Sequence, residues 1–205
     1  MISFIQRLED LTTENPSAPA ITCAGETMAR VELLNAGYNL AVYLHQHGVR
    51  EDDMVTVAVP NSIDFFIAYI AAWRLGATPQ PISSRLPQRE LDAIIELARS
   101  SAVIGVAEDS IKGRVCVPTG FRAPEADASF LPYVVSKAWK APTSGGSTGR
   151  PKLIVSGDPA ALDPDLPIPL LMQKGGCLVM PGPLYHNGPA VWSCQAWLNG
   201  LHVVL

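Results

Sequence analysis

Residues 54–62, MVTVAVPNS, form a run of β-branched side chains that ends in a proline turn. Such a run is typical of a strand buried on both faces, as in parallel sheets. Working outward from it, strand-like and helix-like stretches alternate in both directions. We predict further strands at 20–23, 77–81, 102–106, 177–180 and 202–205, and helices at 1–11, 31–47, 63–75, 87–100 and 188–199. This alternation predicts an α/β fold with mainly parallel sheets flanked by helices.

The turn at the end of the run also predicts where the next helix starts. Pro60, Asn61 and Ser62 are typical of a helix start, and Asp64, three residues after Asn61, places an acid in the first helical turn. We therefore expect the 63–75 helix to begin directly after these residues.

Composition narrows the class of protein. The 205 residues are 48% hydrophobic and 17% charged, which is enough apolar surface for a packed core. A formal net charge of −4 argues against binding nucleic acid by phosphate neutralisation. The first residues do not have the pattern of a signal peptide, so we expect none, and no apolar run is as long as the ~20 residues of a membrane helix. The four cysteines stand far apart without metal-ligand spacing, so we predict no metal site and a reduced, cytoplasmic protein.

Residues 143–152, TSGGSTGRPK, form the segment with the clearest chemistry. Glycines let successive backbone amides surround an anion, and hydroxyls and cations add further donors for phosphate. The segment is not a P-loop, because Gly149 is followed by Arg150, and it is not a dinucleotide fingerprint, because Ser144 stands where glycine is required. On composition alone, a flexible surface loop remains the alternative to a phosphate site.

The order of residues in four segments resembles one family. Residues 144–152 resemble the phosphate loop of the adenylate-forming superfamily, which includes acyl-CoA synthetases, luciferases and the adenylation domains of peptide synthetases. Residues 48–62, 74–82 and 183–188 resemble three further motifs of that family, in the family's order. The resemblance implies an incomplete N-terminal domain of the adenylate-forming fold. Residues 1–205 would be the N-terminal portion of the AMP-binding domain, without its remainder and without the C-terminal lid domain.

The resemblance also implies roles for particular residues. Those expected to bind the ATP phosphates are Thr143, Ser144, Gly145, Gly146, Ser147, Thr148, Gly149 and Lys152. Those expected to line the acyl and adenylate pocket are Tyr185, His186, Asn187 and Gly188. His186 is the expected catalytic residue, since an imidazole there can stabilise charge near the α-phosphate. We assign no role to His45, His47 or His202.

The implied function is that of an acid–thiol ligase. It would use ATP, Mg²⁺ and coenzyme A to convert a small carboxylic acid first into an acyl-adenylate and then into an acyl-CoA thioester. Residues 152–155 and 185–187 look closest to acyl-CoA ligases for bulky or steroid-like acids, such as bile-acid ligases, so the expected setting is fatty or steroid acid metabolism. No nucleic acid or membrane segment is expected as a partner, and a homo-oligomer is left open. The later family motifs are missing, so we expect the truncated chain to be inactive alone.

Two other functions remain open at this point. One is a non-catalytic nucleotide-binding or regulatory module that keeps the same fold. The other is an unrelated phosphate-binding α/β protein, in which Lys152 would contribute nothing to nucleotide affinity.

Overall fold

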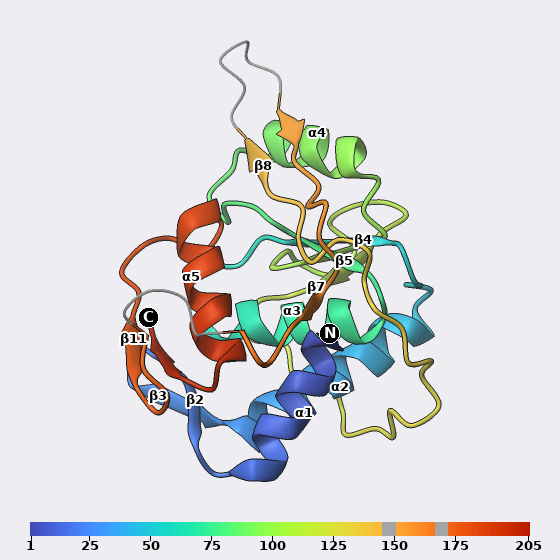
Figure 1. Cartoon of the computed structure of the whole chain (residues 1–205). Coiled ribbons are helices and arrows are strands. Elements are labelled where there is room, and N and C mark those ends of the chain that lie inside the picture. The colour runs from blue at the N-terminus through green and yellow to red at the C-terminus, as the bar shows by residue number, and fades with distance from the viewer. Residues whose placement is uncertain (145–150, 167–171) are drawn as a thin grey trace.

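The computed structural model describes residues 1–144, 151–166 and 172–205 and places two four-stranded sheets around shared helices (Figure 1). All strands of the first sheet are parallel. Its order is β5 (Thr78–Pro81), β4 (Met54–Val57), β6 (Ala102–Ile104) and β7 (Val115–Val117). β4 is the strand of the MVTVAVPNS run, and it lies inside the sheet as its β-branched composition predicts.

The second sheet joins the two ends of the chain. Its order is β11 (Cys177–Val179), β12 (His202–Val204), β2 (Pro19–Cys23) and β3 (Glu26–Ala29). The first three strands are parallel, and β3 returns antiparallel to β2. Segments separated by almost the whole sequence therefore pair through backbone hydrogen bonds.

The helices are α1 (Phe4–Glu14), α2 (Arg30–Gln46), α3 (Ile63–Arg74), α4 (Gln88–Ala98) and α5 (Asn187–Leu198). α3 contacts β4 and β5 of the first sheet and β2 of the second. Every residue of α3 except Asp64 is buried, as expected for a helix with packing partners on all sides. Within the described ranges, no helix is both long enough and apolar enough to span a membrane.

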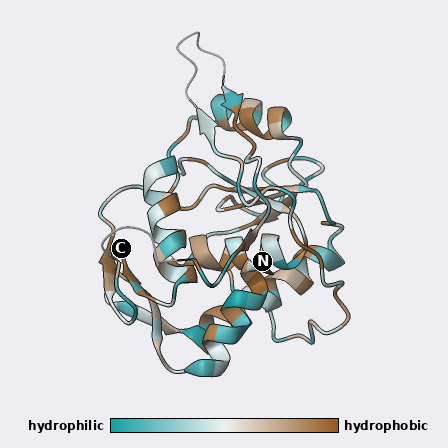
Figure 2. Cartoon of the chain, viewed as in Figure 1, coloured by the Kyte–Doolittle hydropathy of each residue, from teal (hydrophilic) through white to brown (hydrophobic). Residues whose placement is uncertain are grey.

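α4 covers the opposite face of the first sheet from α3. Its apolar residues, Leu91, Ile94 and Ile95, form a small core with Ala58 and Val103 of the sheet. The other side of α4 faces solvent, and Figure 2 shows hydrophobic and hydrophilic residues together along this helix. The first sheet is thus covered on both faces, which agrees with its parallel topology.

The predicted α/β fold with mainly parallel sheets is confirmed, and the predicted helices and longer strands are all present with ends shifted by a few residues. The first helix starts at Phe4 rather than Met1, because Ile2–Ser3 form a short strand, β1, antiparallel to β10 (Ala161–Leu162). β3, β7 and the two-residue strands were not predicted, because such short strands show no clear periodicity.

The predicted helix start at residues 60–62 is confirmed, with Asp64 in the first turn of α3. The N-cap of α3 is Ser62, and no side chain caps the helix. Asn61 instead donates from Nδ2 to the Gly182 carbonyl (2.9 Å) and accepts at Oδ1 from the Leu184 amide (2.8 Å). An amide side chain satisfies both a donor and an acceptor at once, and here the backbone segment that needs both lies more than 120 residues away.

Candidate functional site

The glycine-rich segment lies between the strands of a small hairpin. β8 (Thr143–Ser144) pairs antiparallel with β9 (Lys152–Leu153), so that Ser144 stands opposite Lys152. Further from the glycine-rich segment along the hairpin, the Ile154 amide donates to the Pro142 carbonyl (2.9 Å) and extends the pairing. The hairpin therefore holds the two ends of the glycine-rich segment together. At these ends it places the Ser144 hydroxyl and the exposed Lys152 ammonium group.

A backbone contact attaches this hairpin to the first sheet. The Ala141 amide donates to the Pro79 carbonyl of β5 (2.9 Å), at the edge of the sheet. The predicted phosphate ligands Thr143, Ser144 and Lys152 are thus placed on a fixed base. The other predicted phosphate ligands, Gly145, Gly146, Ser147, Thr148 and Gly149, lie outside the described residues.

The second predicted motif, residues 183–188, forms the turn that enters α5. Asn61 holds the backbone of this turn at Gly182 and Leu184, and His186 is the N-cap residue of α5 with extended backbone angles. His186 is exposed, and its ring centroid lies 4.4 Å from that of Tyr185. The turn therefore presents Tyr185 and His186 together at the start of the helix.

Lys140 links the two motifs, although it belongs to neither of the predicted sets of site residues. Its Nζ donates to Oδ1 of Asn187, and it also lies 4.3 Å from the centroid of the Trp139 ring. The residue is only 6% exposed, although it directly precedes the hairpin that carries Thr143 and Lys152. One buried side chain therefore ties the base of the hairpin to the residue next to His186. A lysine within the apolar stretch AWKAP, residues 138–142, was the sequence signal for it.

Burial sets the electrostatics around Lys140. Burial lowers the pKa of Lys140, and the nearby Cys194 thiol opposes this shift. Burial likewise raises the pKa of the Cys194 thiol to about 12, against a smaller opposing effect of Lys140. No carboxylate forms an ion pair with Lys140 among residues 1–144, 151–166 and 172–205. The Lys140 ammonium group therefore contacts the Asn187 amide oxygen and the face of the Trp139 ring.

The predicted pocket residues do not line the open cavity that the described residues form beside the second sheet. An open cavity of about 510 Å³ lies beside β11 and α5, lined by Met172, Leu178, Met180, Trp192 and neighbouring residues. None of Tyr185, His186, Asn187 and Gly188 lines it. The assignment of these four residues to an acyl and adenylate pocket stays a prediction.

The three histidines without an assigned role lie apart from this site. His47 is exposed, and its Nδ1 lies 2.7 Å from the carbonyl of Tyr43 in the same helix. His45 is half-buried near Phe130. His202 Nε2 lies 2.8 Å from Thr22 Oγ1 in the second sheet.

Comparison with known families identifies the family to which the chain belongs. The family model described as AMP-binding enzyme matches residues 8–205. The chain belongs to the AMP-binding enzyme family. The match covers the hairpin, the turn before α5 and nearly all of both sheets.

The relatives that this chain matches are much longer than the chain itself. Enterobactin synthase component F from Escherichia coli is 31% identical over 158 residues, which cover 73% of this chain and 12% of that protein. N-benzoylphenylalaninol synthetase apmA from Penicillium brevicompactum is 27% identical over 158 residues, covering 73% of this chain and 7% of that protein. The chain thus spans about one tenth of the length of these curated relatives.

Solved structures show the same fold at low sequence identity. FmoA3, a nonribosomal peptide synthetase, superposes with a TM-score of 0.84 at 19% identity, over 99% of this chain and 22% of that chain. The N-terminal subdomain of Klebsiella oxytoca NpsA, in complex with 3-hydroxybenzoyl-AMSN, superposes with a TM-score of 0.78 at 18% identity, over 100% of this chain and 53% of that chain. The fold is that of the N-terminal subdomain of adenylate-forming enzymes, and the chain covers part of it.

The relatives do not single out one branch of the family. FmoA3 is a nonribosomal peptide synthetase. The N-terminal domain of FACL13 from Mycobacterium tuberculosis superposes as well as that of NpsA does, with a TM-score of 0.78 at 19% identity over 100% of this chain and 57% of that chain. The comparisons therefore support an adenylate-forming enzyme and do not support the narrower resemblance to bile-acid ligases.

Proposed function

We propose that the chain is the N-terminal portion of an ATP-dependent ligase that activates a carboxylic acid as an acyl-adenylate. The observation that carries the proposal is the β8–β9 hairpin, which sets Ser144 opposite Lys152 at the two ends of the glycine-rich segment. Lys140 ties this hairpin to Asn187, next to His186. Family membership supports the same reaction class.

In this proposal the hairpin binds the β- and γ-phosphates of ATP. Lys152 supplies a point charge, while Thr143 and Ser144 supply hydroxyl donors. A substrate carboxylate oxygen attacks the α-phosphorus, a new C–O–P linkage forms, and the bond to the β-phosphate oxygen breaks with its electron pair leaving on pyrophosphate. His186 would stabilise the charge that develops near the α-phosphate.

Mg²⁺ is expected to enter with the nucleotide. Among the described residues, no group of three or more His, Cys, Asp or Glu side chains could hold a metal ion. A site with so few metal-ligating side chains fits an ion that is held mainly by substrate phosphates and water, as Mg²⁺ often is. When bound, the ion would offset phosphate charge, and the residues of the hairpin would orient the phosphates.

We propose coenzyme A as the thiol that displaces AMP, because residues 152–155 and 185–187 resemble acyl-CoA ligases. A carrier protein is the second candidate, since similar structures include a peptide synthetase fused as an adenylation–PCP di-domain. In either case the thiol sulfur forms a bond to the acyl carbon and AMP leaves. The non-catalytic nucleotide-binding module remains the alternative to both.

Lys152→Ala tests the proposed phosphate site in the 205-residue chain itself. We expect the chain to bind MgATP and magnesium pyrophosphate, and Lys152→Ala to weaken both affinities about tenfold, which is about 1.4 kcal/mol. Isothermal titration calorimetry measures the affinities.

Lys112→Ala is the matched control, because Lys112 is also exposed but precedes β7, at the edge of the first sheet away from β5. It should bind both ligands as the wild-type chain does. A wild-type chain without affinity for pyrophosphate or ATP, or equal affinities for Lys152→Ala and the wild type, would overturn the proposal.

A further inference from the structure

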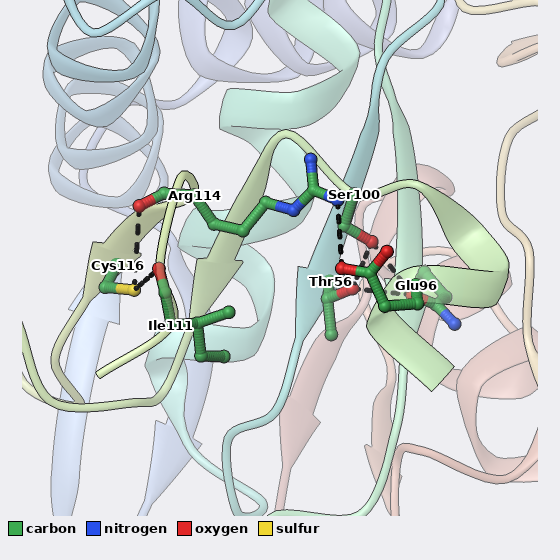
Figure 3. A network of polar contacts seen from close by, with 7 residues as sticks. Thr56, Glu96, Ser100, Ile111, Arg114 and Cys116 are labelled. Carbon is green, nitrogen blue, oxygen red and sulfur yellow. Dashed lines mark hydrogen bonds and ion pairs between the residues drawn. The ribbon is translucent and has the colours of Figure 1, made fainter. Parts of the chain in front are cut away.

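A buried polar cluster lies in the layer between the first sheet and α4. Thr56 of β4, Gln80 of β5 and Ser100, which follows α4, are each 0% exposed. The rest of that layer is apolar and consists of residues such as Ala58, Ile94 and Val103. A buried amide and two hydroxyls in such a layer would cost free energy unless they were hydrogen-bonded to each other. Figure 3 shows Thr56 and Ser100 directed toward one another within this cluster.

The hydrogen bonds of the cluster orient the Gln80 amide. Thr56 Oγ1 donates to Gln80 Oε1 at 2.6 Å, and Ser100 Oγ approaches the same oxygen at 3.4 Å. Thr56 and Ser100 are also bonded to each other at 2.6 Å. A separation of 2.6 Å is typical of an O–H···O bond and too short for most N–H···O bonds. The carbonyl end of the Gln80 amide therefore faces the hydroxyls, and the NH₂ group faces the other way.

The NH₂ group of Gln80 reaches the phosphate hairpin. Nε2 donates to Thr143 Oγ1 at 3.0 Å, a separation typical of an N–H···O bond. An amide nitrogen cannot accept a hydrogen bond, so the Thr143 hydroxyl proton has to be directed elsewhere. Thr143 lies at the end of the glycine-rich segment, where the proposed ligand brings phosphate oxygens that only accept.

We propose that Gln80 is a positioning residue for the phosphate site. Through the Thr56 and Ser100 hydroxyls its amide is held in one orientation, and through Nε2 it fixes the Thr143 hydroxyl as a donor to phosphate. The inference rests on the proposed function, because it assigns a direction to one of the phosphate ligands of that site. The inference also goes beyond the proposed function, because Gln80 itself touches neither nucleotide nor substrate.

A double-mutant cycle tests the inference, with magnesium pyrophosphate as the probe and calorimetry as the readout. Gln80→Met keeps the length of the side chain and removes both polar ends, and we expect pyrophosphate affinity to fall about three- to tenfold, the size of one neutral hydrogen bond. Thr143→Val removes the hydroxyl and should cost a similar factor. If Gln80 acts through that hydroxyl, Gln80→Met should cost almost nothing in the Thr143→Val background.

A second variant keeps the test decisive if Gln80→Met does not fold. Thr56→Val leaves the hairpin untouched and removes the donor that orients the amide, so we expect a two- to threefold loss of affinity that also disappears in the Thr143→Val background. If Gln80 and Thr56 had only a structural role, their substitution would change thermal stability. The affinity loss that each causes would then multiply with the loss caused by Thr143→Val.

The outcomes separate this inference from the proposed function. If the wild-type chain binds pyrophosphate and Lys152→Ala weakens it, the phosphate site stands. The role of Gln80 alone would then be overturned if the affinity losses of Gln80→Met and Thr143→Val multiplied in the double mutant. It would also be overturned if neither Gln80→Met nor Thr56→Val changed the affinity for pyrophosphate. Absence of pyrophosphate binding by the wild-type chain would overturn both.

Discussion

At the scale of single residues, Lys140 and Cys194 show how position changes chemistry. Each is almost fully buried, and each lies close enough to affect the ionisation of the other. The interior disfavours both charged forms, so burial lowers the pKa of the amine and raises that of the thiol. Neither shift follows from the residue type, and both depend on the burial of these two side chains.

The buried thiol predicts a particular pH dependence of stability. Burial raises the pKa of Cys194 from near 9 to about 12, so the unfolded chain loses this proton first as the pH rises. The stability that the protonated thiol contributes is complete below about pH 9 and is lost between about pH 9 and 12, at no more than about 1.4 kcal/mol per pH unit. Cys194→Ala should therefore lose stability less steeply over this range.

Urea unfolding under reducing conditions at pH 8, 9, 10 and 11 measures this effect. Cys177→Ala is the control, because Cys177 is exposed, and it should follow the wild-type slope. Because Cys194 and Lys140 influence each other, the difference in slope reports the thiol together with its effect on Lys140. Equal slopes for Cys194→Ala and Cys177→Ala would contradict the prediction.

At the scale of elements, the fold depends on how closely two helices approach. Gly37 lies inside α2 and is buried against α3. A Cβ at position 37 would stand 2.3 Å from Cγ2 of Ile70, which is far inside van der Waals contact. Glycine weakens a helix by about 1 kcal/mol relative to alanine, so its presence here reflects packing and not helix propensity.

Gly37→Ala is therefore expected to destabilise the chain although it improves helix propensity. At a separation of 2.3 Å we expect an overpacking cost in the upper part of the usual range, about 2–3 kcal/mol, so that after the propensity gain of about 1 kcal/mol the free energy of unfolding falls by about 1–2 kcal/mol. In an Ile70→Ala background the loss should shrink, because the Cγ2 atom in the way is gone. Chemical denaturation measures all four proteins.

Gly157→Ala is the matched control for this change. A Cβ at Gly157 would meet nothing within 4 Å, so we expect a change within about 0.5 kcal/mol. If Gly37→Ala were as stable as Gly157→Ala, close approach of α2 and α3 would not be the reason for the glycine.

At the scale of the whole molecule, two arginines connect the beginning of the chain to its other end. Arg30 donates to the Leu11 carbonyl and to the Gly200 carbonyl, each at 2.8 Å. Arg7 donates from Nε to the Leu198 carbonyl at 3.0 Å. α5 has no basic residue in its own last turn, so residues from α1 and α2 satisfy carbonyls at and just beyond its C-terminal end.

Arg30→Met should destabilise the molecule as one unit. Loss of two hydrogen bonds from a charged donor is expected to cost about 2–4 kcal/mol. Because α1, α2 and α5 share one core, circular dichroism and tryptophan fluorescence should still report a single unfolding transition at lower urea.

Arg89→Met provides the comparison, because Arg89 is exposed on α4 and its loss should change stability by less than about 0.5 kcal/mol. Two separate transitions in Arg30→Met, or a midpoint equal to that of Arg89→Met, would show that Arg30 does not connect the two ends.

Much of the fold was predictable because it follows from local patterns. The β-branched run at residues 54–57 and the amphipathic spacing of α4 depend only on neighbours in the sequence. The glycine-rich segment was recognisable as a candidate phosphate site from its glycines and hydroxyls, and the structure adds that Ser144 and Lys152 pair at its two ends. The contacts of Asn61 with Gly182 and Leu184 could not be predicted, since a short polar side chain before a helix has the same local signature whether it caps that helix or binds a distant turn.

The sequence by itself determined the α/β alternation, the order of the family motifs and the residue types of the phosphate segment, because these depend on neighbours within a few positions. Only the tertiary structure decided that Gln80 meets Thr143, that Lys140 meets Asn187 and that Arg30 meets Gly200. The partners in these pairs stand 63, 47 and 170 residues apart. A buried polar group takes its partner from whatever packing brings within hydrogen-bond distance, and that is a property of the assembled sheets and helices.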